Sequence, residues 1–280
     1  MEVPKSPVDL PGYNTLKRCR EGWMLYNKND KYLGKSLDIY GEFSQGEADL
    51  MRQVLTPGAF AIDIGAYNGD LTIPMANIVG PTGLIIAFEP QRLLYQTLCA
   101  NVAINSLINV VCRYEALADV PGTLNIPVFH PDQDMSYGNY SLEGWEGGEQ
   151  VAITTLDTLN LPHCEMIKID VEGMERKVLL GGRNLIMKHR PILYVENDRA
   201  ELKDALIQTI DEFGYEMYWH FPRLYNPDNY FGNPEDIFDN IASENMLCIP
   251  RERGTKVDGL QRVEVPSGQP ATVVPEHGES

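Results

Sequence analysis

The sequence predicts an α/β fold built on a mostly parallel, seven-stranded sheet with helices on both faces. Seven short apolar runs occur between residues 59 and 250, and stretches with the apolar spacing of a helix separate most of them. The runs are continuously apolar rather than alternating, which is typical of strands buried on both faces. Several runs end in polar residues. In a parallel sheet these ends share one edge, where ligands of such folds bind.

The expected strands are, in chain order, 59–64, 84–88, 109–114, 166–170, 192–196, 215–221 and 246–250. Helices are expected after Gly69 through Ile78, and then over 91–103, 171–188 and 199–213. Each helical stretch carries apolar residues three or four positions apart. This alternation of strand and helix predicts a series of parallel crossover units.

Composition divides the 280 residues into three regions. Residues 1–47 are irregular and mixed in charge, which predicts an N-terminal cap. Residues 48–250 carry the strand and helix patterns and form the predicted main domain. Residues 251–280 contain several Pro and Gly residues without a sustained apolar period, which predicts a flexible C-terminal tail.

The charge and the cysteines restrict the partners. The formal net charge is −17, and such a surface repels nucleic-acid backbones and anionic lipids. No stretch reaches the roughly 18 apolar residues of a membrane helix, and the N-terminus has no apolar signal segment. The five cysteines are odd in number and form no C-x-x-C pair, which favours a reducing compartment over disulfides or zinc. These features predict a cytoplasmic protein with no nucleic-acid or membrane partner.

The first predicted strand ends in the sequence Asp63-Ile64-Gly65-Ala66-Tyr67-Asn68-Gly69. Glycines at such a turn let a ligand approach the backbone closely. The spacing differs from G-x-G-x-x-G, the fingerprint of dinucleotide binding. An acid two residues before the first glycine suits a ligand with an amino group or a positive charge.

Glu89 ends the second predicted strand and is followed by Pro90. A carboxylate at this position can accept two hydrogen bonds from a ribose diol, which indicates nucleoside recognition. The alternative is an acid that faces water at the end of a strand.

Taken together, the motifs resemble those of class I S-adenosylmethionine (SAM)-dependent methyltransferases, and most closely those of the FkbM family. The family pattern D-x-G-A-x-x-G, F-E-P and K-I-D-V-E-G-x-E appears in order at residues 63–69, 88–90 and 168–175, within a similarity that covers about residues 40–250. The resemblance implies a Rossmann-like class I methyltransferase fold and SAM as the cofactor. It also implies O-methylation of a hydroxyl on a sugar or a polyketide-like small molecule, with a carbohydrate favoured.

The same resemblance assigns roles around SAM. Asp63, Gly65 and Gly69 would border its methionine part, and Glu89 would hold its ribose hydroxyls. Thr72 would help to bind the methionine carboxylate at a helix N-terminus. The other candidates are two residues of the glycine loop, Ala66 and Asn68, and two that would flank the adenine, Ala116 and Leu117.

Methyl transfer to a hydroxyl requires a group that takes the proton. Asp170 is the favoured base, because it ends the central predicted strand beside the glycine loop. Lys168 lies two residues earlier on the same face of that strand and can pair with Asp170, and Glu172 is close in sequence. The alternative role for Asp170 is the N-cap of the following helix, and the two roles are compatible.

Further candidates lie on the acceptor side. His220, at the end of the sixth predicted strand, is either a second base or a packed histidine. Asp170, Glu196 and Asn197 form an oxygen-only set suited to Mg²⁺. This set resembles the metal site of catechol-type and some sugar O-methyltransferases, but the FkbM resemblance itself implies no metal.

Two long irregular segments are expected near the acceptor. The insertion 127–148 would close over it, with Asn139 and Tyr140 as the residues to test. The stretch 221–238 is rich in aromatic residues and Asn. Its rings would either stack on a sugar or pack against the sheet.

Two other functions remain open at this point. One is an NAD-dependent oxidoreductase of Rossmann fold, which the missing G-x-G-x-x-G disfavours. The other is a non-catalytic SAM-binding protein. Against it, acids remain at the strand ends, at Asp63, Glu89 and Asp170.

Overall fold

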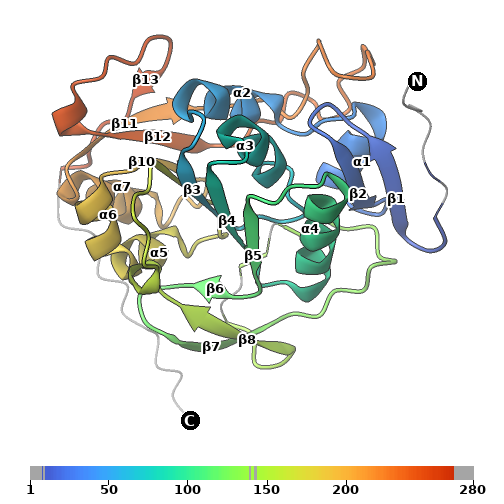
Figure 1. Ribbon diagram of the computed structural model, residues 1–280, viewed down its shortest axis with the longest axis horizontal. Helices are drawn as coiled ribbons and strands as arrows, with labels where there is room; N and C mark the ends of the chain where they lie inside the picture. The colour runs from blue at the N-terminus through green and yellow to red at the C-terminus, as the bar shows by residue number, and fades with distance from the viewer. Residues whose placement is uncertain (1–7, 9, 139, 142–143, 268–280) are drawn as a thin grey trace.

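The computed structural model describes residues 8, 10–138, 140–141 and 144–267 (Figure 1). Its main sheet has eight strands in the order β13-β11-β12-β10-β9-β3-β4-β5. Their bounds are β3 (Phe60–Ile64), β4 (Leu84–Phe88), β5 (Val110–Arg113), β9 (Met166–Ile169), β10 (Ile192–Glu196), β11 (Tyr215–His220), β12 (Asn245–Pro250) and β13 (Gln261–Arg262). All seven predicted strands are present, and the predicted α/β fold is confirmed. β13 is an additional short strand at the edge.

The strand directions differ from the expectation at one position. β5, β4, β3, β9 and β10 are parallel neighbours, but β12 runs antiparallel to both β10 and β11. The prediction that every strand presents its carboxyl end to one edge is therefore wrong for β12. A loop rather than a crossover helix joins β11 to β12, and an antiparallel return needs no crossover. This loop, residues 221–244, therefore lies at the edge where the parallel strands end.

Helices cover both faces of the main sheet, as predicted. The helices are α1 (Leu33–Ile39), α2 (Gln45–Val54), α3 (Thr72–Val79), α4 (Arg92–Ile104), α5 (Glu175–Gly181), α6 (Arg183–His189) and α7 (Lys203–Glu212). Successive strand residues face opposite sides. Ile85 therefore belongs to the hydrophobic cluster that includes α2 and α3, and Ile86 to the cluster on the other face, which includes α5, α6 and α7. None of the helices in the described part of the chain is long and apolar enough to cross a membrane.

The predicted helix 171–188 is divided into α5 and α6. Gly182 lies between them, where a Cβ atom would come within 2.6 Å of Leu156. α5 begins only at Glu175, after a turn in which Glu172 has a φ of +57°. The Glu175 carboxylate accepts hydrogen bonds from the backbone N–H groups of Val171 and Gly173 at 3.0 Å. Asp170 is therefore not the N-cap of this helix.

Two smaller elements flank the main sheet. A hairpin of β1 (Asn14–Arg18) and β2 (Trp23–Asn27) packs beside α4, where Asn101 exchanges hydrogen bonds of 2.6 and 2.9 Å with the backbone of Leu25. The predicted cap, which contains this hairpin, therefore packs directly on the main domain.

A three-stranded sheet is formed by β6 (Ala116–Leu117), β7 (Gly122–Ile126) and β8 (Glu149–Thr154).

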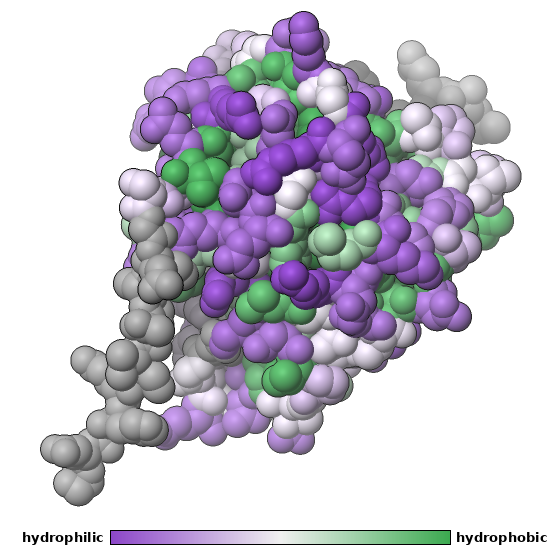
Figure 2. Space-filling view, turned by 90° about the vertical axis from the view of Figure 1, so that its left-hand side faces the viewer, coloured by the Kyte–Doolittle hydropathy of each residue, from purple (hydrophilic) through white to green (hydrophobic). Residues whose placement is uncertain are grey.

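The start of the predicted flexible tail is packed rather than free. Gln261 and Arg262 pair with β11, and Val263 is only 5% exposed. Figure 2 views the molecule from the side on which β13, α6 and α7 lie in Figure 1. That face is mainly hydrophilic, with scattered apolar residues. The tail up to residue 263 thus extends the sheet at this side.

Candidate active site

A cavity of about 400 Å³ opens at the carboxyl edge of the parallel strands. This volume is within the range of small-molecule sites. Each of four neighbouring strands contributes residues to its lining: Gly65 after β3, Glu89 and Pro90 after β4, Lys168 and Asp170 at the end of β9, and Glu196 at the end of β10. The predicted meeting of polar strand ends at one edge is therefore observed.

Three segments outside the sheet wall the same cavity. They are the N-terminal segment with Leu33, Phe43 and Glu47, the insertion with Ser136, Gly138 and Tyr140, and the β11–β12 loop with Leu224 and residues 241–244. Tyr140, one of the two insertion residues chosen for testing, is in this wall. The other, Asn139, lies outside the described residues.

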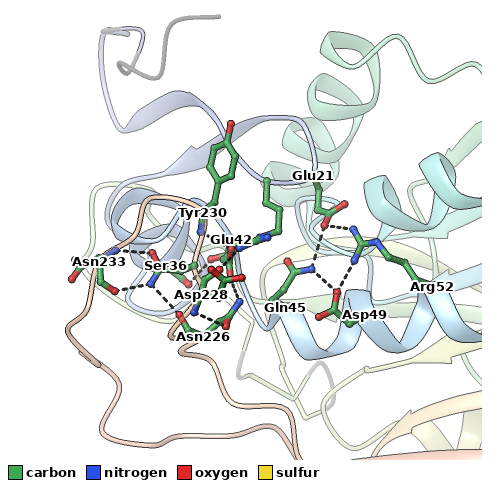
Figure 3. Close-up of polar contacts among 12 residues, drawn as sticks. Glu21, Ser36, Glu42, Gln45, Asp49, Arg52, Asn226, Asp228, Tyr230 and Asn233 are labelled. Carbon is green, nitrogen blue, oxygen red and sulfur yellow. Dashed lines mark hydrogen bonds and ion pairs between the residues drawn. The ribbon is translucent and has the colours of Figure 1, made fainter.

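Glu42 holds the N-terminal segment and the β11–β12 loop together (Figure 3). Its carboxylate is buried and accepts hydrogen bonds from Arg20 Nε at 2.5 Å, Asn226 Nδ2 at 2.8 Å and the backbone N–H of Tyr230 at 2.8 Å. A buried charge is stable only when it is paired and hydrogen-bonded in this way. Glu42 thus fixes two walls of the cavity relative to each other.

Gly65 is required where the glycine loop passes β9. Its φ is +77°, and a Cβ atom there would come within 1.8 Å of the Asp170 carbonyl oxygen. The sequence analysis expected glycine in this loop to let a ligand approach the backbone. The close approach that requires Gly65 in the structure is that of the protein's own backbone at Asp170.

Asp63 is completely buried and does not line the cavity. Its Oδ2 accepts a hydrogen bond of 2.5 Å from Thr72 Oγ1, and its Oδ1 lies 3.4 Å from Lys168 Nζ. The Thr72 hydroxyl is thus engaged by Asp63, and Thr72 is also completely buried. Both residues lie behind the lining of the cavity, and neither is among the described residues that line it.

Lys168 joins the glycine loop to the candidate base. Its Nζ donates to the Gly65 carbonyl at 2.7 Å and lies 3.4 Å from Asp170 Oδ2, which confirms the predicted pairing. Burial alone would lower the pKa of Lys168, but Asp170 and Asp63 raise it above its usual value. The ammonium therefore stays charged, and Lys168 positions Asp170 rather than taking a proton.

Glu89 faces the cavity rather than water, so the alternative role considered for it is wrong. It is 4% exposed, and its two oxygens accept hydrogen bonds from the backbone N–H groups of Tyr67 at 2.9 Å and Gln91 at 2.8 Å. Burial raises the pKa of Glu89 to about 8. Each carboxylate oxygen can accept a second hydrogen bond, which suits a ligand diol.

Three carboxylates in the lining of the cavity lie close together. Asp170, Glu172 and Glu196 each offer an oxygen within 4.8 Å of the others. Burial and the neighbouring Asp170 raise the pKa of Glu196, and burial raises that of Glu172 to about 8. Oε2 of Glu196 is buried without a hydrogen-bond partner. Glu172 also forms an ion pair with Arg199.

The predicted metal set is only partly brought together. Asp170 and Glu196 are neighbours, but the side-chain amide of Asn197 contacts Met246 Sδ at 3.5 Å instead. Side chains alternate along a strand, so the residue after Glu196 points to the other side. The third oxygen of the cluster comes from Glu172.

His220 packs away from the cavity. Its Nδ1 forms a hydrogen bond of 2.9 Å with Tyr194 Oη, which also accepts one of 2.9 Å from Asn245. Burial lowers the pKa of His220. The structure therefore favours the packed histidine over the second base.

Four other predicted SAM-binding residues are buried elsewhere. They are Ala66 and Asn68 in the glycine loop, and Ala116 and Leu117 in β6. None of them is among the described residues that line the cavity. β6 pairs with β8 in the small sheet, which explains the position of the last two.

Sequence reasoning missed Glu47 and Asp70, which both line the cavity. Asp70 directly follows the glycine loop, so its position was a usable signal. Glu47 belongs to the pattern Ser44-x-x-Glu47, in which Ser44 Oγ donates to Glu47 Oε1 at 2.8 Å. Such a pattern indicates a helix start and gave no reason to expect a site residue.

The strand order and the cavity at the carboxyl edge of the parallel strands agree with the class I methyltransferase fold expected from the sequence. Residues 63–217 match the sequence profile of the Methyltransferase FkbM domain. The chain therefore belongs to the FkbM methyltransferase family, and SAM is its cofactor. This membership argues against the NAD-dependent alternative. No curated protein sequence matches the chain.

Several solved structures match this chain at low sequence identity and with TM-scores below 0.5. The methyltransferase FkbM from Methylobacillus flagellatus KT is 15% identical, with a TM-score of 0.41, over 76% of this chain and 52% of that one. Fibrillarin from Aeropyrum pernix, in complex with SAM, is 14% identical, with a TM-score of 0.44, over 88% of this chain and 98% of that one. Precorrin-6y C5,15-methyltransferase from Geobacter metallireducens GS-15 is 12% identical, with a TM-score of 0.44, over 73% and 87%.

Proposed function

We propose that this protein is an O-methyltransferase that moves the methyl group of SAM to a hydroxyl of a small molecule, with a carbohydrate as the favoured acceptor. The observation that carries the proposal is the position of Asp170. Its carboxylate lines the same cavity as Glu89 and is held by the buried Lys168. One cavity thus holds a group for a ribose and a group for a hydroxyl proton.

The cavity suits SAM at the end formed by the glycine loop. Glu89 is a buried carboxylate with free acceptor capacity toward the cavity, as ribose hydroxyls require. Gly65 exposes backbone to the same space. When bound, SAM supplies an electrophilic methyl group on a positively charged sulfur.

Asp170 supplies the base in the same cavity. Its side chain is 39% exposed, so an acceptor can reach it from the cavity. The acceptor hydroxyl passes its proton to the Asp170 carboxylate as its oxygen forms the new bond to carbon. Lys168 fixes the carboxylate, and fixed alignment of the reacting groups is a large part of such catalysis.

The lining of the cavity favours an acceptor without phosphate. Lys168 is the only cationic side chain among the described residues that line it. Acidic side chains in the lining come from the N-terminal segment, from the strand ends and from the β11–β12 loop. A phosphate backbone or a sugar phosphate would be repelled. The hydroxyls of Tyr140 and Ser243 and the apolar side chains of Leu224 and Ile241 line the same space, which suits a sugar ring with polar edges and an apolar face.

We predict that the purified protein with SAM and a panel of neutral mono- and oligosaccharides gives S-adenosylhomocysteine and a product heavier by one CH₂ unit. The position of the new methyl group on oxygen is read by NMR. Glu201→Gln, at an exposed position outside the cavity, should leave this activity unchanged. A methyl group on nitrogen or carbon would contradict the proposal, and SAM binding without transfer would favour the non-catalytic alternative.

A separate prediction concerns Mg²⁺ at the three clustered carboxylates. Asp170, Glu172 and Glu196 could hold it through three oxygens, and its charge would lower the pKa of a bound hydroxyl. If so, excess EDTA should abolish methyl transfer and added Mg²⁺ should restore it. Equal activity in EDTA and in Mg²⁺ would exclude the metal and leave Asp170 as the base.

We also propose a cytoplasmic location. The five cysteines are free in the structure, as in proteins of reducing compartments.

A further inference from the structure

The glycine-loop end of the cavity is rich in negative charge. Lys168 Nζ lies 3.4 Å from carboxylate oxygens of both Asp63 and Asp170. The acids Glu47 and Asp70 line the same cavity as Lys168, and their negative charges also help to raise its pKa. One ammonium cannot balance four carboxylates in a buried region, where unpaired charge is costly. This end of the cavity therefore requires either bound protons or a cationic ligand group.

Asp63 cannot be the group that meets such a ligand. It does not line the cavity, and both of its oxygens face Thr72 and Lys168. The carboxylates of Glu47 and Asp70, by contrast, both line the cavity.

Glu47 reaches this place from the N-terminal segment. It lies in the first turn of α2, is 7% exposed, and receives hydrogen bonds from the hydroxyls of Ser44 and Ser243. Its position is fixed from both sides, because Ser44 precedes α2 and Ser243 belongs to the β11–β12 loop. A carboxylate fixed in this way is well placed to accept from a ligand ammonium.

We propose that Glu47 and Asp70, which line the same cavity, bind the amino group of the methionine part of SAM, in place of Asp63. The inference rests on the proposed placement of SAM in this cavity. Under this inference, the N-terminal segment covers the domain and also supplies a residue that binds the cofactor.

The protonation of the two acids gives this contact a pH dependence. Burial raises the pKa of both Glu47 and Asp70 to about 7. The groups that act on Glu47 by hydrogen bond are Ser44 from its own turn and Ser243 from the β11–β12 loop, and those that act by charge are Lys168, Asp170 and Asp70. Because a carboxylate must lose its proton to bind an ammonium, affinity for the amino group should rise between pH 6 and pH 8.

The test compares two ligands by isothermal titration calorimetry. S-adenosylhomocysteine carries the amino acid, and 5′-methylthioadenosine keeps the adenosine and the thioether but lacks the amino acid. Glu47→Gln should weaken S-adenosylhomocysteine about tenfold to a hundredfold and leave 5′-methylthioadenosine unchanged. If Glu47 instead lay near the carboxylate of the ligand, removing its negative charge would strengthen binding. Weaker binding of S-adenosylhomocysteine therefore identifies the ligand ammonium as the partner of Glu47. For the wild type, only S-adenosylhomocysteine should gain affinity from pH 6 to pH 8 relative to 5′-methylthioadenosine.

Asp70→Asn provides a second variant if Glu47→Gln does not fold, and it should show the same selective loss. Glu201→Gln is the control and should bind both ligands as the wild type does. Equal affinity of wild type and both variants for S-adenosylhomocysteine would overturn the inference while leaving the proposed function intact. If the wild type binds neither ligand, the proposed function and this inference both fail.

Discussion

Asp170→Asn should reduce the rate of methyl transfer by about 10²- to 10⁴-fold, the usual contribution of a positioned base. The amide keeps the shape of the side chain but cannot take the hydroxyl proton. Because the proposed role of Asp170 is to take the proton of the acceptor and not to bind the cofactor, the affinity for S-adenosylhomocysteine should change little. The rate is measured at saturating SAM with an acceptor from the saccharide panel, and binding is measured by calorimetry.

Glu201→Gln is the matched control for this variant, because it makes the same kind of change outside the cavity. Turnover of Asp170→Asn within a factor of two or three of the wild type would show that another group takes the proton. Glu172 and Glu196, whose oxygens lie within 4.8 Å of Asp170, would then be the next residues to test.

Lys168→Met should destabilise the fold by about 3–5 kcal/mol, the cost of leaving a buried charge without its partner. The Lys168 side chain is 6% exposed, and its removal leaves Asp63, which is completely buried, without a cation. The hydrogen bond to the Gly65 carbonyl is lost as well. The loss is read as the free energy of unfolding from urea titrations followed by circular dichroism.

Lys203→Met is the comparison for the stability measurement, since Lys203 pairs with Glu244 in a more exposed ion pair and should cost no more than about 1 kcal/mol. Adding Asp63→Asn to Lys168→Met should recover part of the lost stability, because it removes the orphaned charge. Strictly additive losses in the double variant would mean that Lys168 and Asp63 do not act as a pair.

Local pattern was sufficient for much of the fold. Each apolar run such as residues 84–88 is short, continuous and bounded by turn residues, and each became a strand of the main sheet. The direction of β12 was not available from pattern, because its apolar run reads the same in either direction. It depends on the loop 221–244, which returns the chain without a crossover.

The site was predictable where residues follow strand ends directly. Glu89 and Asp170 reach the cavity for this reason, since parallel strands deliver their ends to one place. Asn197 and Glu172 show the limit of this reasoning. The local backbone decides which of two nearby residues faces the cavity. Glu172 lines the cavity from a turn in which its φ is +57°, a conformation that the sequence does not reveal.

Glu42 and Glu47 required the tertiary structure. Glu42 contacts Asn226 and Tyr230 far along the chain. Glu47 reaches the cavity that Lys168 also lines only because α2 packs against the main sheet. Such long-range contacts leave no spacing signal. The same cause displaced Ala116 and Leu117, which pair with a strand of the small sheet.

The most direct test of the account is a crystal structure of the protein with S-adenosylhomocysteine. The ligand should occupy the cavity at the carboxyl edge, with its ribose hydroxyls on Glu89, its amino group at Glu47, and its sulfur facing the space beside Asp170. A ligand bound outside this cavity, or bound in it with the sulfur turned away from Asp170, would contradict the account.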